Sequence, residues 1–276
     1  LQPVVQATPA AFRMLVSAHA SHEELFLVRE LVRKVQGANA SGGSSAGASA
    51  EDRVAVAWRS SEKTQPAATK FTVPPVDAPN VAGARAFGFT VPDSATAAAD
   101  LAGLRDAIEA GAVKALYVID PGPAGSLGDI QWLLEARAAG KLPLLVVQGV
   151  LLTPLAAAAD IVLAGAAWTE KEATYTNDRG ILQGTSRVMA APGEAKEDWQ
   201  ILTMVAAELG VAMTYADAGA VLEAIAADMT GTAAGKTGTA EKAEDGGYSK
   251  SDFVASFAGF APASDPDAQA FRAELG

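Results

Sequence analysis

Short aliphatic runs alternate with helical patterns in the middle of the chain, and this alternation constrains the fold more than any other feature. The runs that indicate buried strands are 114–119, 144–147 and 161–163. Leu101, Leu104 and Ile108 share one helical face before Gly111, and a second helix is predicted to begin at Ser126. Strands joined through helices need right-handed crossovers. The sequence therefore predicts an α/β fold: a parallel sheet with helices on both faces.

The flanking segments extend this pattern. Residues 12–17 and 53–58 are predicted strands. Ser21, followed by Glu24, has the capping-box pattern for a helix that runs to Gly37. Helices are also predicted at about 194–209 and 217–227.

Composition shifts divide the chain into segments. Residues 1–37 form an opening strand–helix unit, 38–50 a flexible Ala/Ser/Gly linker, 51–228 the parallel α/β domain, and 229–276 an irregular C-terminal extension. The apolar stretch 142–168 is interrupted by Pro143, Gln148, Pro154 and Asp160. It is interpreted as two buried strands and not as a membrane-spanning helix, so no direct membrane insertion is expected.

The absence of cysteine excludes several kinds of chemistry. With no cysteine among 276 residues, the chain cannot form a disulfide, a thiolate metal site or an iron–sulfur cluster from its own residues. A net charge of -11 argues against nucleic-acid binding, which needs clustered cations. His19 and His22 form a close pair that is expected to be solvated, because no further ligand completes a metal site. No metal is therefore predicted.

Several segments, in order, resemble the molybdopterin-oxidoreductase-like region of the G subunit of bacterial NADH:quinone oxidoreductase (complex I). The segments are 17–26, 77–85 with its Pro-Asn-x-x-Gly-Ala-Arg pattern, 114–119, 159–164, 169–177 followed by 179–183, and the Pro192-Gly193 and Asp198-Trp199 pairs. The resemblance covers about residues 12–227. It implies a Rossmann-like domain that carries no molybdenum centre. This chain departs from the pattern at Ala173, where the family usually has Gly, and at Arg179-Gly180, which reverses the usual order.

The resemblance also suggests a cofactor-binding set within 169–183. Its members are Glu172, Thr174, Asn177, Arg179 and Gln183. In a cofactor-binding relative, such groups at the end of a strand can hydrogen-bond a pterin or its phosphates. The alternative is that they cap a loop and tie it to the sheet. The Gly-rich turn 121–128 can likewise present backbone N–H groups to a phosphate, but it matches no established phosphate-binding motif.

A second resemblance lies in the C-terminal extension. Residues 235–262 resemble the K-T-G box of penicillin-binding transpeptidases, with Lys236, Thr237 and Gly238 at the positions of the motif. Ser60 and Lys63 fit the accompanying S-x-x-K pattern by letters, in a segment without a helical period. An S-x-N motif is absent from the sequence.

Three functions remain open at this point. The first is a fragment or subunit of a respiratory NADH:quinone oxidoreductase, with a structural role, no redox centre of its own and other subunits as partners. It implies a cytoplasmic location, peripheral to the inner membrane, and no cofactor held by this chain alone. The second is an acyl-transfer enzyme that uses the K-T-G segment. The third is pterin or nucleotide binding.

Overall fold

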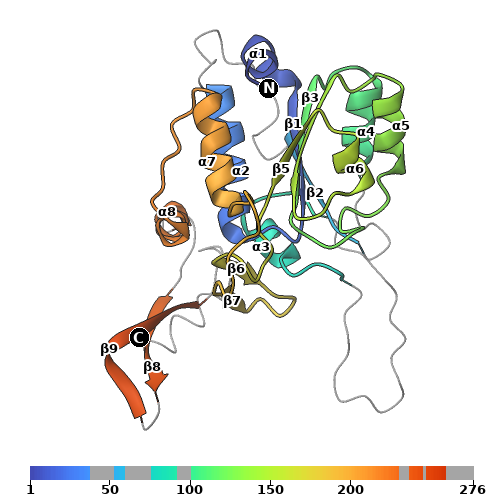
Figure 1. Cartoon of the computed structure of the whole chain (residues 1–276). Coiled ribbons are helices and arrows are strands. Elements are labelled where there is room, and N and C mark those ends of the chain that lie inside the picture. The colour runs from blue at the N-terminus through green and yellow to red at the C-terminus, as the bar shows by residue number, and fades with distance from the viewer. Residues whose placement is uncertain (38–52, 60–75, 92–100, 230–235, 245–246, 259–276) are drawn as a thin grey trace, which may run out of the picture.

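A computed structural model describes residues 1–37, 53–59, 76–91, 101–229, 236–244 and 247–258 (Figure 1). The predicted linker 38–50 and the S-x-x-K pair Ser60 and Lys63 lie outside the described residues. In the described part, no helix is both long enough and apolar enough to cross a membrane.

The core is a five-stranded parallel sheet with strand order β2-β1-β3-β4-β5. The strands are β1 (Phe12–Ser17), β2 (Val54–Ala57), β3 (Ala115–Asp120), β4 (Leu144–Gly149) and β5 (Ile161–Ala164). All five were predicted as strands, and the predicted fold class is confirmed. Because β1 and β3 are neighbours while β2 lies on the other side of β1, the chain reverses direction across the sheet between β1 and β3.

Helices cover both faces of the sheet (Figure 1). One face carries α2 (His22–Gly37), α7 (Asp198–Glu208) and α8 (Ala218–Met229); the other carries α4 (Ala102–Glu109), α5 (Gln131–Ala138) and α6 (Pro154–Ala157). Side chains alternate along β3, so Tyr117 faces the first layer and Leu116 the second. The shorter helices α1 (Gln2–Ala7) and α3 (Val81–Ala86), with a 3-10 turn at Pro9–Ala11, complete the domain.

Helix starts were predicted with mixed success. The capping box before α2 is present, since Glu24 N donates to Ser21 Oγ at 3.3 Å and Ser21 N donates to Glu24 Oε2 at 3.2 Å. The prediction that a helix begins at Ser126 is wrong, because α5 begins at Gln131. The predicted helix at 194–209 is α7, which begins only at Asp198.

Two antiparallel hairpins were not predicted. The first joins β6 (Ala173–Thr176) to β7 (Leu182–Thr185) and lies near the carboxyl ends of the sheet strands, beside α2 and α3 (Figure 1). The second joins β8 (Lys236–Glu244) to β9 (Gly247–Ala258). The C-terminal extension was predicted to be irregular, and within it residues 236–244 and 247–258 form these two strands.

Candidate functional site

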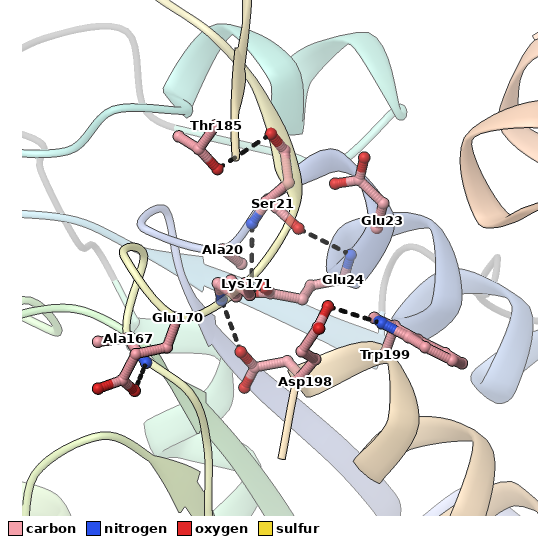
Figure 2. Close-up of polar contacts among 12 residues, drawn as sticks. Ala20, Ser21, Glu23, Glu24, Ala167, Glu170, Lys171, Thr185, Asp198 and Trp199 are labelled. Carbon is pink, nitrogen blue, oxygen red and sulfur yellow. Dashed lines mark hydrogen bonds and ion pairs between the residues drawn. The ribbon is translucent and has the colours of Figure 1, made fainter. Parts of the chain in front are cut away.

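A buried lysine links three elements at the carboxyl end of the sheet. Lys171, just before β6, places its Nζ 2.5 Å from Glu24 Oε1 and 2.5 Å from Asp198 Oδ2 (Figure 2). The three side chains are at most 3% exposed. Glu24 lies at the amino end of α2 and Asp198 at the amino end of α7. Lys171 therefore ties the segment that leads into the β6–β7 hairpin to both helices.

The cluster continues into the sheet. Gln148 Nε2, near the end of β4, donates to Asp198 Oδ1 at 2.7 Å, and the Tyr117 hydroxyl donates to Gln148 Oε1. Gln148 and Tyr117 are both fully buried. From Tyr117 through Gln148 and Asp198 to Lys171 and Glu24, each buried side chain of the cluster thus has a polar partner, which such groups need in a low-dielectric interior.

Burial and charge set the protonation of the cluster. Burial, the larger effect, raises the pKa of Glu24 to about 7, and Asp198 adds to this while Lys171 opposes it. Burial lowers the pKa of Lys171, but Asp198 and Glu24 outweigh it and hold that pKa well above its usual range. Lys171 therefore stays charged, while burial, with a smaller contribution from Asp198, raises the pKa of Glu24 into the neutral range.

Threonines of β6 form a second link between the hairpin and α2. Glu23 accepts hydrogen bonds from Thr174 N at 3.0 Å and from Thr174 Oγ1 at 2.8 Å. His22 Nδ1 lies 3.0 Å from Thr174 Oγ1, and His22 Nε2 lies 3.0 Å from Thr176 Oγ1. A neutral imidazole that carries its hydrogen on Nδ1 satisfies all of these contacts. Burial lowers the pKa of His22 to about 4, which agrees with that state.

A third link runs through the Pro-Asn-x-x-Gly-Ala-Arg segment. Asn80 Nδ2 donates to Ala20 O at 2.8 Å, and Asn80 Oδ1 accepts from Thr176 N at 2.8 Å. A Cβ added at Gly83 would overlap Asn80 Oδ1 and His22 Nε2. Glycine at this position of the motif therefore allows Asn80 and His22 to meet the hairpin.

The five residues predicted to bind a cofactor are not brought together around one point. Thr174 reaches α2, as described above. Asn177 Nδ2 donates to Gln183 Oε1 at 3.2 Å, and Asn177 Oδ1 accepts from Arg179 N at 2.9 Å, so these contacts close the hairpin turn. Glu172, Arg179 and Gln183 are exposed. The contacts of Thr174, Asn177 and Gln183 are those of a loop tied to the sheet.

The two histidines differ from their predicted surroundings. His22 is fully buried, so the expectation of a solvated pair is wrong for it. His19 is part-buried, and its Nδ1 lies 3.1 Å from Ser17 Oγ. Across the described residues, no group of three or more metal-ligating side chains is placed to hold an ion.

In each of the βα turns after β1 and β3, one backbone donor bonds to a carboxyl group of the chain itself. After β1, the Ser21 N–H is taken by Glu24. After β3, Gly122 N donates to Asp120 Oδ1 at 3.3 Å, and the Ser126 hydroxyl donates to the same oxygen. Backbone N–H groups at these places are the usual phosphate donors. A phosphate bound through either of these donors would have to displace that carboxyl group.

A separate small pocket opens where the chain reverses direction across the sheet. It has a volume of about 380 Å³ and is lined by His19, Arg59, Val76, Asp77, Ala78, Pro79, Pro123 and Ser126. Arg59 and Asp77 form an ion pair across 3.5 Å. Ligands of open α/β sheets bind at this kind of position.

Comparison with known families identifies the domain. A model described as molybdopterin oxidoreductase matches residues 11–208. The chain belongs to the molybdopterin oxidoreductase family. This match includes the sheet, α2, the β6–β7 hairpin and Lys171, so the buried cluster lies within the family domain.

Three relatives show how broad the similarity is. The F420-dependent formate dehydrogenase 1 subunit alpha of Methanococcus maripaludis is 40% identical over 98 residues, 36% of this chain and 14% of the relative. The NADPH-Fe(3+) oxidoreductase subunit alpha of Geobacter sulfurreducens is 34% identical over 155 residues, 56% of this chain and 18% of the relative. The mitochondrial NADH-ubiquinone oxidoreductase 78 kDa subunit of Neurospora crassa is 51% identical over 59 residues, 21% of this chain and 8% of the relative.

The chain spans less than a fifth of the length of the curated relatives it matches. These relatives include subunits of NADH-ubiquinone oxidoreductases and of formate dehydrogenases. The predicted resemblance is thus confirmed at the level of the family and of homology to NADH-ubiquinone oxidoreductase subunits.

The C-terminal extension matches a different family model. A model described as penicillin binding protein transpeptidase domain matches residues 204–270, a minor part of the chain. Lys236, Thr237 and Gly238 lie on β8, opposite Ala258, Phe257 and Ser256 of β9. The K-T-G segment is therefore on a strand.

Sequence reasoning missed the residues at the centre of the cluster. Lys171, Glu24 and Asp198 all lie inside the segments that carried the family resemblance, but the binding role was given to their exposed neighbours. The available signal was Gln148, a polar residue directly after two valines of a buried strand. Such a residue needs a buried partner.

Proposed function

We propose that this chain is a structural domain of a respiratory oxidoreductase of the NADH:quinone type and holds no redox centre of its own. On this proposal it acts on the cytoplasmic side, peripheral to the inner membrane, through the other subunits of the complex. The observation that carries the proposal is the Lys171 cluster, which fastens the β6–β7 hairpin to α2 and α7.

The side chains of Thr174 and Asn177 form their hydrogen bonds with other residues of the domain. Thr174 is bonded to Glu23, and Asn177 is bonded within its own turn. In a site that binds a ligand, some of these groups would point into a cavity and lack a protein partner. The arrangement supports a role in holding the domain in one shape for assembly.

The described residues do not fit the phosphates and metal of a molybdopterin. One backbone donor of each βα turn, Ser21 N and Gly122 N, bonds to Glu24 and Asp120 respectively, and the sequence offers no thiolate. We therefore derive no reaction step through that group.

Co-expression with the other subunits of the parent complex tests the proposal. We expect the chain to co-purify with them, and we expect molybdenum and pterin to be absent in stoichiometric amount after expression in a molybdopterin-producing host. A Lys171→Met variant should assemble less, with unchanged activity per assembled complex. Stoichiometric pterin, or wild-type chain that fails to assemble, would contradict the proposal.

The match of the C-terminal extension favours acyl transfer of the penicillin-binding type as a second candidate. In such enzymes a serine oxygen attacks the carbonyl carbon of an amide while a nearby lysine takes the serine proton. The C–N bond then breaks, the amine leaves with a proton, and the acyl group stays on the serine. Ser60 and Lys63 are the residues that would fill these roles. Incubation with a fluorescent penicillin, followed by a denaturing gel, tests this. A labelled band that disappears in Ser60→Ala would establish this candidate against the structural one.

The pocket beside His19 supports the third candidate, binding of a nucleotide or pterin fragment. Equilibrium dialysis with GMP and ATP checks it. Saturable binding that is lost in Ser126→Trp, which fills the pocket, would favour this candidate.

A further inference from the structure

Strand β5 has the sequence of a central strand and the exposure of an edge strand. Its four residues, Ile-Val-Leu-Ala, form a continuous aliphatic run of the kind that parallel sheets bury on both sides. Yet Ile161 is 38% exposed and Val162 48% exposed. Strand β5 pairs with β4 alone among the named strands of the sheet.

An apolar groove runs between β5 and α7. It has a volume of about 600 Å³, and its lining includes Val146, Ile161, Leu163, Ile201, Met204, Val205 and Leu209. Met204, on α7, is 55% exposed although it faces this groove. The groove therefore offers space for a large apolar side chain beside the free edge of a sheet.

The outer edge of β5 already accepts a parallel partner at one end. Ala166 N donates to Lys196 O at 2.8 Å, and Lys196 N donates to Ala164 O at 3.1 Å. Gly165 and Lys196 form a parallel bridge. In this parallel register the residues beside Ile161 and Val162 would be those that precede Lys196. They form a turn instead, in which Ala195 N donates to Pro192 O at 3.1 Å, so within the described residues the pairing stops short of Ile161 and Val162. The part of the chain that the structure describes thus begins a pairing along this edge without extending it over Ile161 and Val162.

Charges at the groove favour a basic occupant. Glu194 and Glu208 line it together with Lys196, and the chain as a whole carries a net charge of -11. A second copy of this chain would bring the same acidic groove and the same net charge, which repel. A segment with basic residues is attracted instead.

We propose that the β5 edge and the groove beside α7 bind an extended segment of a partner polypeptide. The segment adds a strand to β5 along Ile161 and Val162. It places an aliphatic or aromatic side chain against Met204 and basic residues against Glu194 and Glu208. Main-chain hydrogen bonds supply part of the affinity, and the groove and its charges supply the selectivity. This inference rests on the proposed structural role and gives that role its docking surface.

Dye-labelled synthetic peptides test the inference on the full chain by fluorescence anisotropy. The probes are Lys-Val-Phe-Val-Lys, its Glu-flanked counterpart, and a version with proline at the centre, which cannot complete a strand. We expect the Lys-flanked peptide to bind at least tenfold more tightly than the other two. Met204→Lys should weaken this binding at least tenfold.

Val188→Lys is the matched control, because Val188 is 73% exposed and does not line the groove. It should leave binding unchanged. Equal binding of the three peptides, absence of binding, or equal loss in both variants would overturn the inference. A dimer in analytical ultracentrifugation that Met204→Lys dissociates would also overturn it in favour of a second copy. The peptide assay needs no other subunit, so its failure is distinct from a failure of co-purification.

Discussion

Replacing Lys171 with methionine removes the shared counterion of two buried carboxylates. The side chains of Glu24 and Asp198 are 2% and 0% exposed, so neither reaches bulk water when the ammonium is gone. Each keeps one neutral donor, Ser21 N for Glu24 and Gln148 Nε2 for Asp198. Removal of one partner from a buried ion pair costs about 3–5 kcal/mol. We expect the free energy of unfolding to fall by about that amount at pH 8.

The loss should be smaller at acid pH. Burial already raises the pKa of Glu24 to about 7, and without Lys171 this pKa rises further. At pH 5.5 Glu24 is then protonated, so the variant buries one charged carboxylate fewer than at pH 8. Urea denaturation followed by circular dichroism, at pH 5.5 and pH 8, measures both values.

Lys141→Met is the matched control. Lys141 also pairs with a glutamate, Glu109, but both side chains are 44% exposed. An exposed pair contributes about 0–1 kcal/mol. If Lys171→Met costs no more than Lys141→Met, or costs the same at both pH values, the argument from burial is refuted. The triple variant Glu24→Gln, Lys171→Met, Asp198→Asn should recover much of the loss, because it leaves no buried charge.

Three further outcomes are expected. The folded state raises the pKa of Glu24 from 4.5 to about 7, so the stability that its protonated form contributes is lost as pH rises between these values. From pH 4.5 to pH 8, the free energy of unfolding of the wild type should fall by up to about 3 kcal/mol relative to that of Glu24→Gln, at 1.36 kcal/mol per pKa unit. If the free energies of the two proteins change in parallel with pH, this reasoning is refuted. Gly83→Ala should cost about 1–3 kcal/mol in thermal unfolding by overpacking against Asn80, whereas a neutral effect would show that the contact relaxes freely. Thr174→Val should speed amide exchange in β6 and cost about 1–3 kcal/mol, because it leaves a buried Glu23 oxygen without its hydroxyl donor; unchanged exchange would remove this link.

Local patterns were sufficient to predict most of the sheet and its helices. The strands 114–119 and 144–147 are continuous aliphatic runs, and the α2 start depends on Ser21 and Glu24, three residues apart. Such signals act within a few residues, so they need no knowledge of the rest of the fold. The start of α5 was misplaced because Ser126 bonds to Asp120, six residues earlier, and not to the helix.

The candidate site could not be predicted in the same way. Lys171 and Glu24 are separated by 147 positions in the sequence, and nothing near either residue indicates the other. The hairpin was missed because β6 and β7 are only four residues each and carry threonine and glycine in place of an aliphatic run. Their stability comes from contacts with α2 and α3, which are tertiary.

The sequence by itself determined the α/β class, the order of most elements and the exclusion of thiolate chemistry, because these follow from composition and from short-range periodicity. Only the tertiary structure decided which charges are buried together, and that Ser21 N and Gly122 N in the β1 and β3 turns bond to Glu24 and Asp120. It also decided that the aliphatic β5 lies at an edge. The physical reason is that a buried charge and a sheet edge are properties of a residue's surroundings, and these surroundings are set by segments far away in the chain.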